Sequence, residues 1–269
     1  MRERIAILAL CFAGAAAGQT FIQMTDPQFG FFTGNKGFEQ ETANFEFAVA
    51  AANRLKPAFV VVTGDLVNQA GDAAQIAEYK RIAAKLDPAI KLYNVAGNHD
   101  LADPPSKESL EKYRAAFGPD YYTFRVGDIA GFVLNSALEK DASQAPEEAA
   151  KMESWLGAEL AKARQDGVKH LIVFQHHSLF LDKPDEPDQY FNIPSGVRLR
   201  YLGLLHQFGV KYVFAGHYHR NAEPRDGDLE MITTGAVGKP LGGSKSGFRI
   251  VKVTPDSVTQ KYYDFGDLP

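Results

Sequence analysis

Short apolar runs rich in β-branched and aromatic residues alternate with longer amphipathic stretches along most of the chain. Apolar runs that end in a polar, often glycine-containing turn are typical of buried strands, whereas apolar residues spaced three and four positions apart predict helices. We therefore expect strands at residues 20–25, 58–63, 90–95, 131–135, 170–174 and 212–215, and helices at residues 39–55, 73–86, 106–117, 146–165 and 198–207. This alternation predicts an α/β fold.

The last part of the chain has a different pattern. Residues 230–234, 248–253 and 257–263 read as three strands with little helix between them, which favours antiparallel or mixed pairing. Two packed sheets are therefore expected instead of one open parallel sheet. No linker-like stretch or shift in composition divides the chain, so we expect a single domain over residues 19–269.

The N-terminal segment has the features of a secretory signal peptide. Arg2 and Arg4 precede an apolar run at residues 5–12, and small residues follow at positions 15–18. A short membrane anchor or a buried first strand are the alternatives, but the run is well under the ~20 apolar residues that span a bilayer. We expect residues 1–18 to be cleaved and the mature protein to be exported, periplasmic or secreted, without a membrane span.

The composition of the chain limits the kinds of partner and metal site that it can have. The formal net charge is −4 and no basic run occurs, so there is no electrostatic case for a nucleic-acid partner. The one cysteine, Cys11, lies in the predicted leader, so the mature chain is expected to have neither a disulfide nor a thiolate ligand for a metal.

Five polar segments each follow a predicted strand. They are Asp26-Pro27-Gln28, Gly64-Asp65, Gly97-Asn98-His99-Asp100, His176-His177 and Gly216-His217-Tyr218-His219. Singly they are weak signals, because Asp and Asn are common turn residues and a histidine is often structural. Strand ends that meet at one sheet edge would gather acids, an amide and imidazoles without a nearby Lys or Arg, which points to divalent cations. The remaining histidines, His170, His177 and His206, are expected to be structural or exposed.

The order of these motifs resembles that of the calcineurin-like metallophosphoesterases, over the span from Asp26 to His219. Residues 26–30, 216–221, 234–236 and 240–242 are most similar to a branch that contains a serine/threonine phosphatase and its bacterial relatives. The resemblance implies a layered α/β/β/α sandwich of two mixed β-sheets flanked by helices. It also implies two divalent metal ions, of manganese, iron, zinc or magnesium, and hydrolysis of phosphate esters by a metal-bound hydroxide.

The resemblance assigns the metal ligands in two sets. Asp65 would bridge the two ions. The ligands of the first ion would be Asp26, Gln28, Asp65 and His219, and those of the second would be Asp65, Asn98, His176 and His217. Gln28 departs from the family pattern, which usually has histidine there. An amide oxygen is a neutral and usually weaker ligand, so either the first ion binds loosely or water takes the place of Gln28.

The resemblance also implies that His99 lies beside the metals as an acid or electrostatic partner, oriented by Asp100. Arg220 and Asn221 directly follow His219 and are expected to contact the phosphate, with a structural ion pair as the alternative for Arg220. The proline-rich, acidic segment at residues 181–194 either covers the site or is a solvated surface loop.

The most favoured function is a phosphomonoesterase, possible substrates being a small-molecule ester or a phosphoprotein as for a serine/threonine protein phosphatase. The same motifs permit a phosphodiesterase or nucleotide hydrolase. A catalytically idle metal-binding scaffold is the third alternative. The pair His99 and Asp100 argues against a scaffold, because a scaffold needs no acid beside its metal ligands. We expect a monomer.

Overall fold

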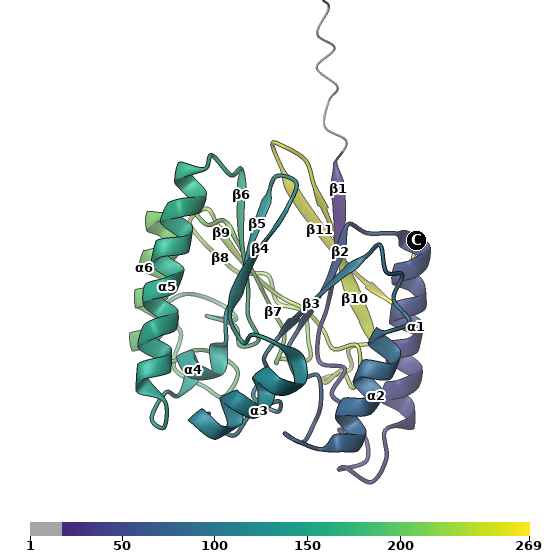
Figure 1. Ribbon diagram of the computed structural model, residues 1–269. Helices are drawn as coiled ribbons and strands as arrows, with labels where there is room; N and C mark the ends of the chain where they lie inside the picture. Colours follow the sequence, from purple (N-terminus) through teal and green to yellow (C-terminus); the bar gives the residue numbers. More distant parts are fainter. Residues whose placement is uncertain (1–17) are drawn as a thin grey trace, which may run out of the picture.

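Two mixed β-sheets pack face to face in the computed structural model, which describes residues 18–269 (Figure 1). The first sheet has the strand order β11-β10-β1-β2-β3. Its strands are β1 (Gln19–Met24), β2 (Phe59–Thr63), β3 (Lys91–Val95), β10 (Gly247–Val253) and β11 (Val258–Asp264). Strands β1, β2 and β3 are parallel, whereas β10 pairs antiparallel with β1 and β11 pairs antiparallel with β10.

The second sheet has the order β4-β5-β6-β7-β9-β8. Its strands are β4 (Tyr122–Val126), β5 (Ile129–Val133), β6 (His170–Phe174), β7 (Tyr212–Ala215), β8 (Arg225–Asp226) and β9 (Leu229–Thr233). Strands β5, β6, β7 and β9 are parallel, and the edge strands β4 and β8 are antiparallel to their neighbours. Both sheets are therefore mixed.

Aromatic side chains fill the space between the sheets. The ring of Phe21 in β1 lies 5.7 Å from that of Phe174 in β6 and 5.5 Å from that of Phe214 in β7. Phe59 in β2 packs edge-on against Phe124 in β4 at 5.2 Å. Burial of each such ring stabilises the fold by about 1.5–3 kcal/mol, so this cluster holds the two sheets together.

Helices cover the outer face of each sheet (Figure 1). Helices α1 (Glu39–Leu55) and α2 (Ala73–Ala83) lie on the first sheet, and α5 (Pro146–Gln165) and α6 (Ser195–Gln207) lie on the second. Helix α3 (Lys107–Phe117) and the short α4 (Ser136–Lys140) lie near one end of the strands. The predicted layered α/β/β/α sandwich is confirmed.

The predicted elements are present with small shifts, and three were missed. The strand predicted at residues 131–135 is β5, which begins at Ile129 and pairs with the unpredicted β4 through a tight turn at Gly127. The short α4 and β8 were also not predicted. The predicted signal peptide lies outside the described residues, apart from Gly18. Within residues 18–269 no helix is long and apolar enough to cross a membrane.

Candidate metal centre

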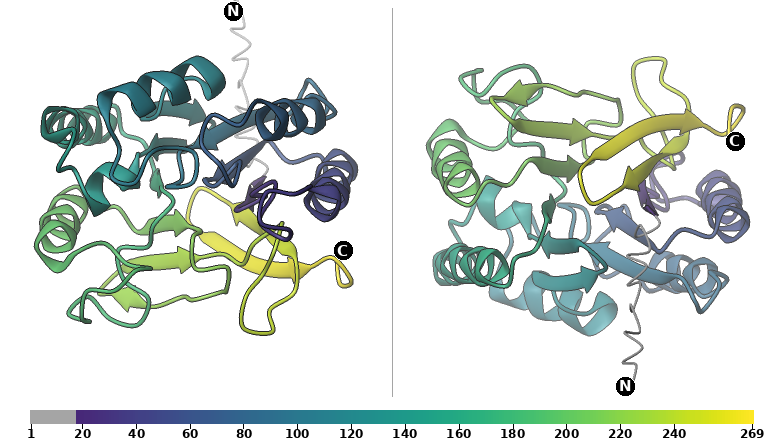
Figure 2. Two further views of the ribbon diagram at one scale, coloured as in Figure 1. Left: turned by 90° about the horizontal axis from the view of Figure 1, so that it is seen from below. Right: turned by 90° about the horizontal axis from the view of Figure 1, so that it is seen from above.

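Loops that follow five strands carry the predicted ligands to one edge of the sandwich. In Figure 1, β1 enters from the top, so this edge is the lower one, which Figure 2 (left) views from below. Because β1, β2 and β3 are parallel, as are β6 and β7, their carboxyl ends meet there. The residues that follow are Asp26 after β1, Asp65 after β2, Asn98 after β3, His176 after β6, and His217 and His219 after β7.

The backbone is left-handed at most of these positions. The φ angle is 51° at Asp26, 43° at Gln28, 49° at Asp65, 65° at His217 and 54° at His219. Non-glycine residues pay of order 1–3 kcal/mol for such conformations, which persist only where the surrounding structure fixes them. These strained conformations reduce the stability of the fold and orient the side chains toward one another, as is common at functional sites.

Two glycines allow the loops to approach one another. A Cβ atom on Gly97 would lie 2.1 Å from the backbone nitrogen of Asp65, and one on Gly216 would lie 1.8 Å from Thr25 Oγ1. Any other residue at these positions would push the loops apart. This explains why glycine directly precedes Asn98 and His217.

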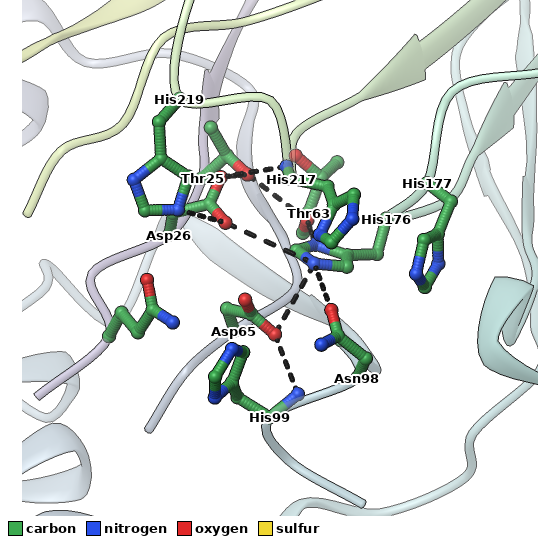
Figure 3. A network of polar contacts seen from close by, with 12 residues as sticks. Thr25, Asp26, Thr63, Asp65, Asn98, His99, His176, His177, His217 and His219 are labelled. Carbon is green, nitrogen blue, oxygen red and sulfur yellow. Dashed lines mark hydrogen bonds and ion pairs between the residues drawn. The ribbon is translucent and has the colours of Figure 1, made fainter. Parts of the chain in front are cut away.

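The gathered side chains form two overlapping groups (Figure 3). One group is Asp26, Asp65 and His219, the other is Asp65, His176 and His217, and the ligand atoms within each lie within 4.8 Å of one another. His219 Nε2 is 3.2 Å from Asp26 Oδ1, and His176 Nε2 is 3.3 Å from Asp65 Oδ1. Asp65 belongs to both groups, as a bridging ligand would.

Backbone carbonyls fix the orientation of the three histidine rings. In each ring one nitrogen lies within hydrogen-bonding distance of a carbonyl oxygen: His176 Nδ1 with Thr63 (2.9 Å), His219 Nδ1 with Lys239 (2.5 Å) and His217 Nε2 with Tyr190 (3.3 Å). A carbonyl oxygen can only accept a hydrogen bond. The ring nitrogen next to it therefore carries the proton. The other nitrogen is left with a lone pair for the cluster, which is how metal-ligating histidines are usually held.

The charges of the cluster fit a cation. Asp26 Oδ2 accepts hydrogen bonds from Thr25 Oγ1 (2.6 Å) and His217 N (3.1 Å), but its buried Oδ1 has no hydrogen-bond partner. Burial disfavours a charged His176, yet the carboxylates of Asp65 and Asp26 raise its pKa to about 9, so without an ion a proton takes the Nε2 lone pair that a cation would use. Burial and the neighbouring His176 lower the pKa of His217 to about 3. An unpartnered buried carboxylate oxygen beside imidazole lone pairs suits a divalent ion.

Gln28 is buried, and its two amide atoms differ in their surroundings. Its Nε2 donates to Asn68 Oδ1 at 3.2 Å, while its Oε1 is buried without a hydrogen-bond partner. The amide is therefore turned so that its oxygen, the atom able to bind a cation, is the free one.

Asn98 and His99 lie on the Asp65 side of the cluster (Figure 3). Asn98 Oδ1 is 3.1 Å from His176 Nε2. The backbone N–H of His99 donates to Asp65 Oδ1 at 3.0 Å, and His99 Nδ1 donates to the carbonyl of Asn68 at 2.9 Å. His99 Nε2 is thus the nitrogen left to take up or release a proton.

Asp100 does not orient His99, which corrects the expectation from the sequence. Its carboxylate accepts hydrogen bonds from the backbone N–H groups of Val67 (3.0 Å) and Gly97 (2.8 Å). Burial and the carboxylate of Asp65 raise the pKa of Asp100 to about 7. Asp100 ties together the two loops that carry Asp65 and Asn98, and the Asn68 carbonyl is the group that orients His99.

The two residues predicted to contact phosphate, Arg220 and Asn221, have different surroundings. Arg220 is exposed, and its guanidinium lies over the ring of Tyr218, 5.2 Å from the centroid. Asn221 Oδ1 instead accepts hydrogen bonds from Gly235 N (3.1 Å) and Arg249 Nη2 (3.0 Å). These bonds fix the orientation of the amide, and its Nδ2 group is the one that would donate to a phosphate oxygen, so the contact of Asn221 with phosphate stays a prediction.

His177 is closer to the site than its sequence context indicates. It is buried, its ring centroid is 4.3 Å from that of His217, and its Nδ1 lies 3.0 Å from Ser136 Oγ. Ser136 Oγ also accepts the backbone N–H groups of His176 and His177. Ser136 begins α4, so sequence reasoning had no signal for this support.

The other two histidines are structural, as expected. His170 Nε2 bonds the carbonyl of Thr254 at 2.7 Å, and His206 Nε2 pairs with Asp226 Oδ2 at 2.7 Å.

Comparison with known proteins agrees with this fold. The model of the calcineurin-like phosphoesterase family matches residues 20–221. The chain is 38% identical to the serine/threonine-protein phosphatase CPPED1 of Homo sapiens, over 92% of this chain and 84% of that protein, and 38% identical to CPPED1 of Danio rerio, over 92% and 85%. The chain belongs to the calcineurin-like phosphoesterase family and is a hydrolase that acts on phosphate esters. The predicted family is confirmed.

Solved structures share the fold at low sequence identity. A dimetal phosphatase from Danio rerio superposes with a TM-score of 0.67 at 16% identity, covering 92% of this chain and 96% of that one. Purple acid phosphatase from yellow lupin has a TM-score of 0.68 at 16% identity, over 94% and 52%. GAP50, the anchor in the inner membrane complex of Plasmodium, has a TM-score of 0.68 at 13% identity, over 94% and 86%.

Proposed function

We propose that this phosphoesterase is a phosphomonoesterase that works with two divalent cations. The observation that carries the metal assignment is the orientation of the three cluster histidines, each of which has one ring nitrogen bonded to a carbonyl and the other directed at carboxylate oxygens. Asp26, Asp65, His219 and the free oxygen of Gln28 would hold the first ion. Asp65, Asn98, His176 and His217 would hold the second.

The donor set suits manganese, iron, zinc or magnesium, because carboxylates, amides and imidazoles are the oxygen and nitrogen ligands that these ions accept. When bound, two such ions lower the pKa of a shared water and neutralise charge on the phosphoryl oxygens. The chain's own residues orient the ester and move the proton.

His99 is proposed as the proton donor to the leaving oxygen. Its Nδ1–H is bound to the Asn68 carbonyl, so a proton for the leaving group would come from Nε2. Arg220 is proposed to attract and orient the phosphate, since it is exposed and held over the Tyr218 ring beside His219.

The monoester preference is supported by the relatives, which are protein phosphatases at 38% identity over most of this chain. A phosphodiesterase would use the same core, and the fold alone does not imply catalysis, because GAP50 shares it as an anchor. Activity is favoured here because the histidines, Asn98 and His99 are all held in place.

An exported location is proposed from the N-terminal sequence, in which Arg2 and Arg4 precede an apolar run and a small-residue stretch. Such an enzyme would act on phosphate esters outside the cytoplasm. Mass spectrometry of the protein expressed in its host should show a chain that begins near Gln19. A full-length chain retained in the cytoplasm would contradict export.

The decisive test is hydrolysis of p-nitrophenyl phosphate and of bis-p-nitrophenyl phosphate by metal-free protein titrated with manganese, zinc, iron or magnesium. We expect metal-restored turnover that is faster with the monoester. His176→Ala should remove one ion and lower turnover by at least about a hundredfold, while His206→Ala, at an exposed ion pair, should leave both unchanged. A faster reaction with the diester would overturn the monoester assignment, and near-normal turnover of His176→Ala would overturn the metal assignment.

A further inference from the structure

The loop between β6 and α6, residues 175–194, packs its tip against the candidate metal centre. The carbonyl of Tyr190 accepts a hydrogen bond from His217 Nε2 at 3.3 Å, and the Tyr190 ring lies 4.8 Å from the His217 ring. The Phe191 ring lies 5.5 Å from that of His217. Although Tyr190 makes these contacts, 55% of it is exposed, so one side of the ring remains open to solvent and to a substrate.

The Tyr190 ring lies beside the ligands of the second ion, because it packs against His217. Burial and the carboxylate of Asp65 raise the pKa of Tyr190, so its hydroxyl keeps its proton. Figure 3 shows His217 and Asn98 on the side of the cluster away from His219. Tyr190 therefore lies on the His217 side of the site.

The Tyr190 side chain provides a hydrogen-bond donor beside His217, a candidate ligand of the second ion. A phenol donates through its O–H and accepts through its oxygen. A donor with a free proton next to a ligand of the second ion can bind an oxygen of an ester held there.

Buried contacts hold this loop in one shape. The Glu186 carboxylate accepts the backbone N–H groups of Leu181 (3.0 Å) and Asp182 (2.7 Å) and the Asn192 side chain (2.6 Å). The fully buried Arg198 donates to the carbonyl of Glu186 at 2.5 Å. These bonds are independent of a substrate, so the loop presents its tip already ordered.

Lys140 of α4 fixes the loop close to its tip. Its Nζ donates to the carbonyls of Gln189 (2.6 Å) and Asn192 (2.7 Å), which flank Tyr190 in sequence. Tyr190 is thus held on both sides by groups outside the loop or within its base, and its phenol does not depend on a flexible segment.

We propose that Tyr190 is a substrate-binding residue whose hydroxyl donates a hydrogen bond to a phosphoryl oxygen of the ester on the His217 side of the site. This inference rests on the proposed phosphomonoesterase function. It assigns to the loop a direct contact with the phosphoryl group in addition to its support of His217.

The test compares Tyr190→Phe with wild type in the metal-loaded full chain. Tyr190→Phe keeps the ring against His217 and removes only the hydroxyl. We expect kcat/KM for p-nitrophenyl phosphate to fall about ten- to a hundredfold, the range for a lost hydrogen bond to a charged group. The inhibition constant for inorganic phosphate should rise, while metal content and the melting temperature stay unchanged. Tyr121→Phe, whose ring packs on Trp155 at 5.0 Å, is the matched control and should behave as wild type.

The outcomes separate this inference from the proposed function. An active wild type with equal kcat/KM and phosphate inhibition in Tyr190→Phe would overturn the role of the hydroxyl and leave the enzyme assignment intact. A loss of metal content in Tyr190→Phe would also overturn it, because Tyr190 would then act through the ligands alone. A wild type without turnover in any metal would overturn the proposed function, and this inference with it.

Discussion

At the scale of single residues, Asp26 and the three cluster histidines each have one polar atom already bound by the protein. Asp26 Oδ2 accepts from Thr25 and from the backbone N–H of His217, and one nitrogen of each cluster histidine bonds a carbonyl. The other polar atom of each of these side chains is left for the cluster. Preorganisation of this kind reduces the entropy that a ligand loses when an ion binds.

His99 offers a prediction about the leaving group. His99→Ala removes the Nε2 proton donor but leaves the cluster ligands in place, so metal content should be unchanged. We expect kcat for phenyl phosphate to fall about 10²- to 10⁴-fold, and for p-nitrophenyl phosphate to fall much less, because nitrophenolate leaves without a proton. Rates measured over a series of substituted phenyl phosphates check this. An equal loss for all leaving groups would contradict the role of His99 as an acid.

Gln28 offers a prediction about the first ion. Its free, buried Oε1 is a weak neutral donor, and imidazole binds borderline divalent ions more tightly. Gln28→His should therefore tighten binding of one ion by roughly tenfold, measured by competition with a zinc chelator. The exposed Gln40→His serves as the control for an added histidine and should not change either affinity. Unchanged affinity in Gln28→His would place residue 28 outside the coordination shell.

The sequence predicted which side chains gather but not what holds them. The order of motifs from Asp26 to His219 pointed to the cluster because each motif follows a strand of a recognisable family pattern. The carbonyls of Thr63, Lys239 and Asn68 carry no sequence signal, because every residue has a carbonyl and only the fold decides which histidine it meets. For the same reason Asp100 was assigned to His99, its sequence neighbour.

At the scale of elements, regular and buried segments were predictable and short or edge segments were not. Strand β2 is buried at every position and reads plainly as a strand. Strand β4 is at a sheet edge with partly exposed residues, and α4 has five residues, too few to show a helical period. Helix α4 nevertheless supplies Ser136 and Lys140, which support the loops after β6.

Asp100 connects the loops that carry Asp65 and Asn98, so its removal should destabilise both loops. Asp100→Ala leaves the buried N–H groups of Val67 and Gly97 without an acceptor, which costs about 2–5 kcal/mol of unfolding free energy. The affinity for the second ion should also fall, because Gly97 precedes Asn98. Urea unfolding and metal titration check both effects. Asp228→Ala, at an exposed position, is the control, and an Asp100→Ala protein as stable as that control would contradict the loop-tying role.

At the scale of the whole molecule, the cluster joins the two sheets. Asp26 and Asp65 follow strands of the first sheet, whereas His176 and His217 follow strands of the second. The aromatic layer between the sheets sets their distance, and so sets how closely these two pairs of ligands approach. Stability of the sandwich and geometry of the site therefore depend on the same packing.

Glu139 links the stability of the whole chain to pH. It is buried in α4, and neither of its carboxylate oxygens has a hydrogen-bond partner. Burial and the charge of Glu153 raise its pKa to about 8, above the value of about 4.3 in an unfolded chain. Between these values the folded protein keeps a proton that the unfolded chain releases. The unfolding free energy should therefore fall as pH rises, by at most about 1.4 kcal/mol per pH unit.

Glu139→Gln stays neutral at every pH and should remove this slope. The difference in unfolding free energy between the variant and wild type should grow in favour of the variant from pH 5 to pH 9. Over this range, wild type must either ionise a buried carboxylate or keep it protonated above the pKa of the unfolded chain. Urea unfolding at fixed metal content, at pH 5, 7 and 9, measures the difference. Glu147→Gln, whose side chain is 71% exposed, controls for the loss of a charge and should run parallel to wild type. If Glu139→Gln also runs parallel, Glu139 is ionised at neutral pH and a cation or water must reach it, which would place a second polar site beneath α4.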